Sequence, residues 1–237
     1  MQLFYTPDIA PHQQSFVLSE EESKHAIRVL RMGAGQRVQL VDGRGGLYTA
    51  AIVDDHPKRA VLEILKAETG RGKRPYYLHI AIAPTKHVER VEWFLEKATE
   101  VGIDEVTPII CEHSERKEVK TERLKKVMVA AMKQSLKAYL PRLNEPLGLG
   151  ALLEHERQGQ RFIAHCADGD KEYVSEMIVP GGRYTILIGP EGDFSGAEIE
   201  ASLRAGFLPI TLGHARLRTE TAALVGCLEA AIANRRY

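Results

Sequence analysis

The sequence predicts an α/β protein of two domains, and three observations support this prediction. Segments with strand character alternate with helical patterns over residues 76–237, and such alternation produces a mostly parallel sheet. Short apolar segments separated by glycine turns occupy residues 1–70, which indicates a small β-rich domain with one helix. Residues 69–75 are polar and contain two glycines, as is typical of a linker. The length of 237 residues leaves room for both domains.

The first domain is expected to contain one helix and a hairpin. Ser19 and Glu22 form a capping-box pattern, and Gly33 suits a helix end, so the helix should cover residues 20–31. Residues 37–41, 47–53 and 60–66 have the character of strands. The glycine cluster at 42–46 resembles a phosphate loop, but no helix follows it, which favours a hairpin turn.

The second domain is expected to alternate five or more strands with helices. Strands are predicted at 76–83, 106–111, 161–166, 184–189 and 208–212. Apolar residues at helical spacing predict a helix over 88–101 that ends at Gly102, and a second over 124–136 stopped by Pro141. Ser195 and Glu198 form another capping box, so a third helix should begin there. The last helix is rich in small residues, which favours close packing within the fold or across a dimer.

Composition excludes several classes of protein. Lys plus Arg and Asp plus Glu number 32 each, so bulk charge does not indicate a nucleic-acid binder, and any such binding must come from local patches. Three separated cysteines form no CxxC pair, which argues against disulfides and structural zinc. The nine histidines do not cluster at metal-ligand spacing, and no metal is expected. Without a long apolar span or signal pattern, we expect a soluble cytoplasmic protein that binds no membrane.

Two glycine-bearing loops are the most informative feature of the chain. The first, ILIGPEGDFS, spans residues 186–195, and the second, LGHARLRTETA, spans residues 212–222. Each joins a predicted strand to a helix, and ligands of open α/β sheets bind outside the carboxyl ends of the strands. The two loops therefore predict one site, although an ordinary β–α turn explains either loop alone. No GxGxxG or Walker A pattern is present, which argues against a dinucleotide or P-loop site.

These loops, together with residues 25–35 (HAIRVLRMGAG) and 92–102 (EWFLEKATEVG), closely resemble the SPOUT superfamily of RNA methyltransferases. Within that superfamily the chain is similar to the 16S ribosomal RNA uracil-N3-methyltransferases. The resemblance implies a C-terminal trefoil knot, a PUA-like RNA-binding barrel at residues 1–70 and a homodimer. It also implies S-adenosylmethionine as cofactor and 16S ribosomal RNA, in the assembled small subunit, as substrate. Another RNA target, a ribose 2'-hydroxyl acceptor and a catalytically silent assembly factor are the alternatives.

The resemblance and the loop chemistry together give a set of cofactor-binding residues. Gly189 and Gly192 permit close approach of the backbone to a flat ligand, and Pro190 stiffens the turn between them. The positive sulfonium of the cofactor favours nearby carboxylates, for which Glu191 and Glu220 are the candidates. The expected cofactor-binding residues are His165, Ile188, Gly189, Pro190, Glu191, Gly192, Leu212, Gly213, Leu217 and Thr221.

Methylation of uracil at N3 requires loss of a weakly acidic proton, and the negative charge then spreads onto the flanking carbonyl oxygens. A guanidinium fork stabilises such an anion, and Arg218 is our candidate to hold the uracil anion or an adjacent phosphate. Glu220 is expected to orient this arginine or to help take the proton, with a plain helix-capping role as the alternative.

RNA contacts are expected at five basic residues. Lys24, Arg28 and Arg31 recur at spacings of four and three, which would place them on one helix face, although a solvated face explains this pattern too. Lys86 follows the first strand of the second domain. Ala215 stands where the family commonly has an arginine. Arg216 follows it directly, and whether Arg216 takes the place of that arginine is open. The chain also departs from the family at Asp193, in place of a frequent glycine, and at Lys133, in place of a glutamate.

Overall fold

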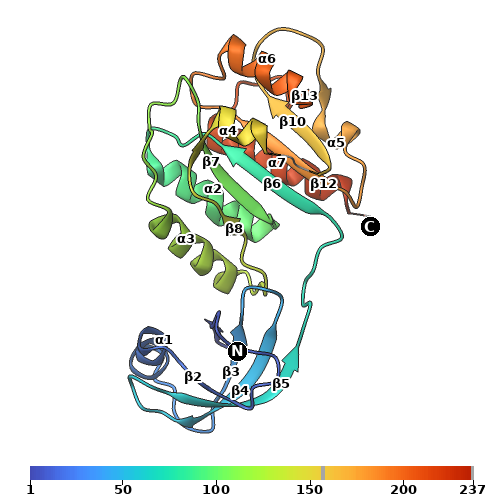
Figure 1. Ribbon diagram of the computed structural model, residues 1–237. Coiled ribbons are helices and arrows are strands. Elements are labelled where there is room, and N and C mark those ends of the chain that lie inside the picture. The colour runs from blue at the N-terminus through green and yellow to red at the C-terminus, as the bar shows by residue number, and fades with distance from the viewer. Residues whose placement is uncertain (156–157, 236–237) are drawn as a thin grey trace. The chain divides into compact units, whose positions relative to one another are not determined.

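The computed structural model describes residues 1–155 and 158–235, and the chain divides into two compact units (Figure 1). The first unit comprises Met1–Lys73 together with Met132–Leu140. The second comprises Arg74–Ala131 together with Pro141–Tyr237. Each unit buries apolar side chains of its own, and each is described separately below.

The first unit is built on a five-stranded sheet in the order β1-β3-β4-β5-β2. Its strands are β1 (Leu3–Tyr5), β2 (Ser15–Val17), β3 (Arg37–Val41), β4 (Leu47–Asp54) and β5 (Val61–Glu68). β1 pairs parallel with β3, and the other pairings are antiparallel. The three predicted strands are confirmed to within two residues at each end. β1 and β2 were missed because three residues are too few to show a period-two pattern.

The predicted helix of this unit forms, but it ends differently. It consists of α1 (Glu20–Lys24), capped by the Ser19 hydroxyl, which accepts a hydrogen bond from the Glu22 amide at 3.2 Å, and continues as the π-helix η1 (His25–Val29). The chain then leaves the helix at Arg31, which adopts a left-handed conformation with φ 53°. The prediction that Gly33 ends the helix is wrong, because Arg31 takes the conformation that usually favours glycine.

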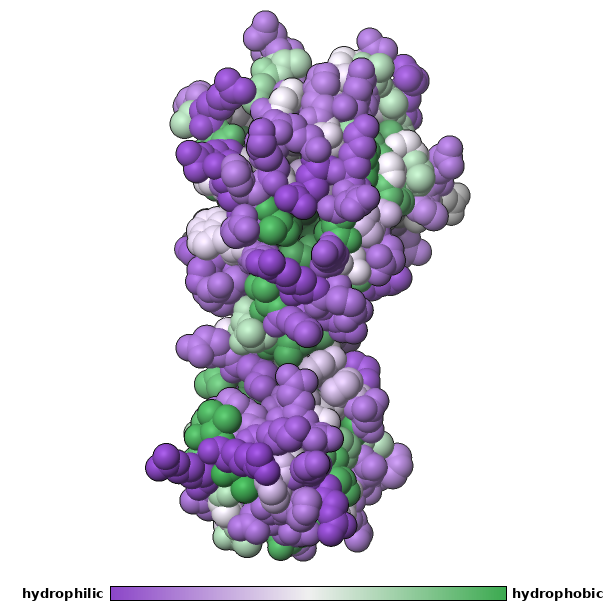
Figure 2. All heavy atoms as spheres, turned by 90° about the vertical axis from the view of Figure 1, so that its left-hand side faces the viewer, coloured by the Kyte–Doolittle hydropathy of each residue, from purple (hydrophilic) through white to green (hydrophobic). Residues whose placement is uncertain are grey.

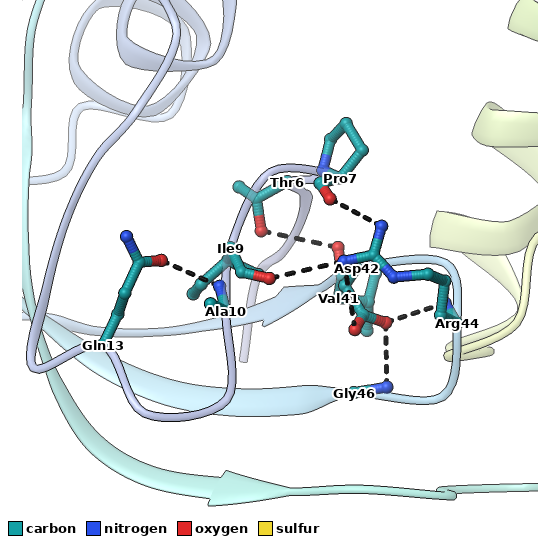
Figure 3. Close-up of polar contacts among 9 residues, drawn as sticks. All are labelled: Thr6, Pro7, Ile9, Ala10, Gln13, Val41, Asp42, Arg44 and Gly46. Carbon is teal, nitrogen blue, oxygen red and sulfur yellow. Dashed lines mark hydrogen bonds and ion pairs between the residues drawn. The ribbon is translucent and has the colours of Figure 1, made fainter.

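The loop 42–46 is the predicted hairpin turn, and Asp42 organises it (Figure 3). One Asp42 carboxylate oxygen accepts hydrogen bonds from the amides of Arg44 (2.7 Å) and Gly46 (2.8 Å). The guanidinium of Arg44 donates to the carbonyls of Pro7 (2.8 Å) and Ile9 (3.4 Å), which joins the loop to the N-terminal segment. The glycine cluster therefore has a structural explanation.

Replacing Asp42 with alanine is expected to lower the free energy of unfolding by about 1–3 kcal/mol, because the buried Gly46 amide and the Arg44 amide lose their acceptor. Asp54→Ala is the matched control. Asp54 accepts one hydrogen bond from the His56 amide at an exposed position, so its loss should cost under about 0.5 kcal/mol. Chemical unfolding followed by circular dichroism measures both variants, and equal costs would contradict the role of Asp42.

The second unit contains an eight-stranded sheet in which every pairing is parallel. The order is β11-β13-β10-β12-β6-β7-β8, and β9 also pairs with β7. The strands are β6 (Tyr77–Ile82), β7 (Glu105–Ile110), β8 (Arg142–Leu143), β9 (Leu147–Gly148), β10 (Gln160–Ala164), β11 (Glu172–Tyr173), β12 (Arg183–Ile188) and β13 (Leu208–Thr211). The α/β class and the five predicted strands are confirmed. The missed strands β8, β9 and β11 have two residues each.

Helices cover both faces of this sheet (Figure 1). They are α2 (Val88–Val101), α4 (Leu149–Glu154), α5 (Val174–Met177), α6 (Gly196–Arg204) and α7 (Thr219–Ala233), and α3 (Thr121–Gln134) runs from the second unit into the first. α2 packs beside α7. The side chains of Ile80 and Ile186 lie against α7 at Gly226. On the opposite face, Ala81 and Leu187 pack in one core with residues of α4 and α6. The prediction that Pro141 stops α3 is wrong, since that helix ends at Gln134.

The face shown in Figure 2 is mostly hydrophilic, with hydrophobic residues visible in patches. Exposed large apolar side chains of the second unit include Trp93 on α2 and Leu228 and Ile232 on α7. Within residues 1–155 and 158–235, the helices are all too short or too polar to cross a membrane.

Candidate active site

The two glycine-bearing loops leave the same edge of the sheet, as predicted. β12 and β13 both pair parallel with β10, so the loops that follow them lie at the carboxyl ends of neighbouring strands. α2 follows β6 and α6 follows β12, and these two helices lie on opposite faces of the sheet. Open α/β sheets bind ligands where the connections from neighbouring strands go to opposite faces in this way. The buried Thr219 hydroxyl donates to the Gly189 carbonyl at 3.1 Å and joins the two loops directly.

The first loop is held close to the core. Ile188, Gly189 and Pro190 are buried, and a Cβ atom on Gly189 would lie 3.0 Å from the Phe194 ring. One carboxylate oxygen of Glu191 accepts a hydrogen bond from the Lys86 amide at 3.0 Å. Glu191 therefore fixes the loop that follows β6, and Gly189 keeps the first loop compact.

Asp193, which stands where the resemblance leads us to expect glycine, adopts a backbone conformation that favours glycine. Its φ of 65° is left-handed, a conformation that Asp tolerates better than most residues. Its carboxylate accepts hydrogen bonds from the amides of Phe194 (2.8 Å) and Cys166 (2.7 Å). The substitution thus links the first loop to the segment that follows β10.

His165, which follows β10, has two buried ring nitrogens without a hydrogen-bond partner in the structure. Burial lowers the pKa of this imidazole, the Lys171 ammonium lowers it further, and Asp193 acts in the opposite direction. Lys171 is held in place because its ammonium donates to the His165 carbonyl at 2.9 Å. A neutral imidazole with one donor and one acceptor nitrogen is thus available to a polar ligand.

The second loop and the start of α7 line a pocket of about 580 Å³ together with α2, here called the α2–α7 pocket. Five predicted residues meet there, which are Arg216, Leu217, Arg218, Glu220 and Thr221. The guanidinium groups of Arg216 and Arg218 are exposed, and within the described part of the chain neither makes a hydrogen bond or an ion pair. Both cations are therefore available to a ligand with negative charge.

Glu220 lies at the inner side of this pocket and is 7 % exposed. One of its carboxylate oxygens, Oε1, lies 3.8 Å from Nε of Arg90, and the other, Oε2, is buried without a hydrogen-bond partner among residues 1–155 and 158–235. A buried carboxylate oxygen without a partner is costly, which distinguishes Glu220 from an ordinary exposed helix cap.

Sequence reasoning missed Glu89, Arg90 and Trp93 as pocket residues, and it missed Thr219 as the link between the loops. The helix pattern contained a signal for the first three. They follow the spacing i, i+1 and i+4, which places them on one side of α2, away from the apolar stripe. The chain's single tryptophan stands on this polar side.

The remaining candidates lie elsewhere. Leu212 and Gly213 form a tight turn in the second loop, where the Gly213 amide donates to the Thr211 hydroxyl at 3.3 Å. Lys86 is exposed and pairs with Glu115 at 2.9 Å, a contact that raises the pKa of this lysine. In the described residues, no three His, Cys, Asp or Glu side chains group together as a metal site would require.

Lys24, Arg28 and Arg31 are exposed in the first unit. The prediction that helical spacing places all three on one face is wrong for Arg31, because η1 ends before it. Lys24 also pairs with Glu20 at 2.6 Å. Exposure, rather than helical periodicity, is what these three cations share.

Two family models match the chain. An RNA methyltransferase domain model matches residues 72–230, and an RNA methyltransferase PUA domain model matches residues 18–65. The ribosomal RNA small subunit methyltransferase E of Mesomycoplasma hyopneumoniae is 30% identical over 183 residues, which cover 75% of this chain and 78% of that protein.

Solved structures with the same fold extend over nearly the whole chain. A probable rRNA-methyltransferase from Porphyromonas gingivalis superposes with a TM-score of 0.92 at 42% identity, covering 99% of both chains. A ribosomal RNA small subunit methyltransferase E from Neisseria gonorrhoeae bound to S-adenosyl methionine superposes with a TM-score of 0.86 at 26% identity, covering 96% of this chain and 95% of that one.

Proposed function

The chain belongs to the RNA methyltransferase family, in the group of ribosomal RNA small subunit methyltransferases E, and we therefore propose that it methylates 16S ribosomal RNA at N3 of a uridine with S-adenosylmethionine as cofactor. The observation that supports this function best is the pairing of the two loops through Thr219 and Gly189, beside a pocket that contains Arg218 and Glu220. We also propose that the assembled small subunit is the substrate and that the protein acts in the cytoplasm.

The residues at the loops suit the cofactor. The two buried ring nitrogens of His165 have no hydrogen-bond partner among the residues that the structure describes, as expected of atoms that bond to a ligand. Gly213 has a φ of 126° and open space beyond its missing Cβ, so the backbone is accessible there. Gly189, Pro190 and Gly192 present main-chain groups to a flat ring, and Ile188, Leu212, Leu217 and Thr221 complete the proposed cofactor site. Glu191, in the first loop, fixes the loop that follows β6 because its carboxylate accepts a hydrogen bond from the Lys86 amide.

When bound, S-adenosylmethionine supplies an electrophilic methyl group on a positively charged sulfur. The residues of the chain must then make uracil N3 nucleophilic, which requires removal of its proton. We propose that Arg218 stabilises the uracil anion through its free guanidinium, and that Glu220 takes the proton on its unpartnered Oε2. Arg90, which lies near Oε1, keeps that carboxylate in place.

The remaining parts of the proposal concern RNA and assembly. We propose residues 1–70 as the PUA-like RNA-binding domain, with Lys24, Arg28 and Arg31 on phosphates, and residues 76–237 as the methyltransferase domain with its trefoil knot. Lys86 and Arg216 are further RNA contacts. The exposed apolar side chains of α7 support a homodimer. A molecular mass in solution that stays that of one chain at all concentrations would contradict the dimer.

Methyl transfer tests the function. Labelled S-adenosylmethionine is incubated with unmodified small ribosomal subunits or with naked ribosomal RNA, and the nucleosides are then analysed by mass spectrometry. N3-methyluridine, formed faster on subunits, is the expected result. Methylated ribose would contradict the N3 assignment, and faster reaction on naked RNA would contradict the assembled substrate. Cofactor binding without transfer to either substrate would contradict the small-subunit assignment.

Thr219→Val is expected to weaken binding of S-adenosylmethionine about tenfold, equivalent to roughly 1.4 kcal/mol, because the Gly189 carbonyl loses its donor. Isothermal titration calorimetry measures the affinity. Thr99→Val is the matched control, since Thr99 is equally buried and donates to the Leu95 carbonyl at 2.7 Å within α2. Unchanged affinity for Thr219→Val, or an equal loss for Thr99→Val, would show that the loop link does not support cofactor binding.

A further inference from the structure

The α2–α7 pocket has the size of a nucleotide site. Its volume of about 580 Å³ lies within the range of small-molecule pockets, which is roughly 300–1,000 Å³. The lining combines an aromatic ring, three guanidinium groups and two carboxylates, contributed by α2 and by the segment 216–221. The pocket therefore joins an apolar surface to groups that bind phosphate or the polar edge of a base.

Trp93 supplies the apolar surface. Its side chain is 42 % exposed, and it lines the pocket from α2. A large exposed aromatic ring beside cationic groups is the combination that single-stranded nucleic-acid sites use, because bases stack on the ring while cations meet the phosphates. Arg216 and Arg218, whose guanidinium groups make no hydrogen bond or ion pair among the described residues, provide those cations.

Glu220 supplies a group that distinguishes one base from another. Its Oε2 atom is buried, has no hydrogen-bond partner in the described part of the chain and belongs to a residue that lines the pocket. An ionised carboxylate only accepts hydrogen bonds. Uracil offers an N–H donor at N3, whereas cytosine has a lone pair there that would face the carboxylate unfavourably. Of these two pyrimidines, uracil is therefore the one whose N3 position satisfies Oε2.

From these contacts we propose that the α2–α7 pocket binds a uracil base unstacked from its RNA, with Trp93 as the stacking surface and Glu220 Oε2 as the acceptor for N3–H. This inference rests on the proposed function and specifies how its substrate is recognised. Arg216 and Arg218 bind the adjoining phosphate and the carbonyl edge of the base. Trp93 is then a substrate-binding residue, and Glu220 determines the preference for uracil over cytosine.

Binding of short RNA strands tests the proposal without turnover. Five-nucleotide strands of uridine, cytidine, N3-methyluridine and abasic ribose phosphate, each with a terminal dye, are titrated with the protein and followed by anisotropy. The uridine strand is expected to bind about tenfold tighter than the other three, since one polar contact and one stacked base each contribute about that factor. Uridine should also quench the emission of Trp93, the only tryptophan in the chain.

Variants separate stacking from hydrogen bonding. Trp93→Leu keeps an apolar side chain but removes the ring, and it should weaken binding of all strands that carry bases about tenfold, while Trp93→Phe retains most of the affinity. Glu220→Gln should remove the preference for uridine, because an amide both donates and accepts. Leu203→Ala is the control, since Leu203 is 41 % exposed on α6 and does not line the pocket. Circular dichroism confirms that each variant is folded.

Three results would overturn the proposal. These are equal binding of uridine and abasic strands, unchanged affinities in folded Trp93→Leu, and a Trp93 emission that follows protein concentration but not RNA. The last would place a second copy of the chain on Trp93. The proposed function fails separately: if the protein showed the uridine preference but methylated no ribosomal RNA, the pocket would stand and the reaction would be wrong.

Discussion

Replacing Arg218 with alanine is expected to lower kcat/KM for methyl transfer roughly 100- to 1,000-fold, the loss typical of removing one donor to a developing anion. The guanidinium of Arg218 makes no hydrogen bond or ion pair among the described residues, and it lines the pocket beside Glu220. Nothing in the fold depends on it, so the loss should appear in the chemical step rather than in stability. Labelled methyl transfer to small subunits at subsaturating concentration measures the effect.

Two further variants make this prediction sharper. Arg218→Lys keeps the positive charge but loses the planar fork, and should recover only part of the activity. Arg204→Ala removes an exposed arginine on α6 that pairs with Glu200 at 3.6 Å, and should leave the rate unchanged. Full activity of Arg218→Ala would remove Arg218 from the mechanism and leave the stabilisation of the uracil anion to another group.

Gly159→Ala is expected to lower the free energy of unfolding of the second unit by about 3 kcal/mol, from a left-handed backbone and from a steric clash. Gly159 has a φ of 95°, and a Cβ atom there would lie 2.2 Å from the backbone carbonyl oxygen of Arg183. This glycine immediately precedes β10, whose first residue Gln160 pairs with Tyr184 on β12. Relief of the clash therefore requires movement of a central strand.

Gly150→Ala is the control for this variant, and it is expected to change the free energy of unfolding in the opposite direction. Gly150 lies in the short helix α4, is exposed, and has open space where a Cβ atom would stand, so alanine should stabilise by about 0.5 kcal/mol. Trp93 emission reports unfolding of the second unit in both variants. Similar stabilities for the two alanine variants would contradict the role assigned to the backbone at Gly159.

The architecture of the second unit could be predicted from sequence because its main strands are long apolar runs and its helices repeat at a clear spacing. Gly102 and the Ser195–Glu198 capping box even marked helix ends correctly. Strands of two or three residues carry no such period and were missed. The π-helical turn at His25–Val29 also has no sequence pattern, since its hydrogen bonds depend on packing.

The candidate site likewise has parts that could be predicted from the sequence and parts that could not. Its loops were evident from sequence, because glycine, proline and capping residues have local causes. Arg90 and Trp93 were missed. The helix pattern places them on the polar side of α2, but only the packing of α2 beside α7 brings them to the second loop. The unpartnered Oε2 of Glu220 and the contact between Thr219 and Gly189 likewise depend on which elements become neighbours in three dimensions. Local chemistry predicted the loops, and tertiary packing determined the pocket.

The hydrogen bond between the Cys166 amide and Asp193 has a practical consequence for labelling. Burial raises the pKa of the Cys111 and Cys227 thiols to about 12, so these two are poorly reactive towards electrophiles at neutral pH. Cys166 is exposed, and its backbone is fixed to the first loop. A thiol-reactive dye would therefore attach selectively beside His165, so that the natural chain, without an introduced cysteine, can serve as an optical sensor of cofactor exchange.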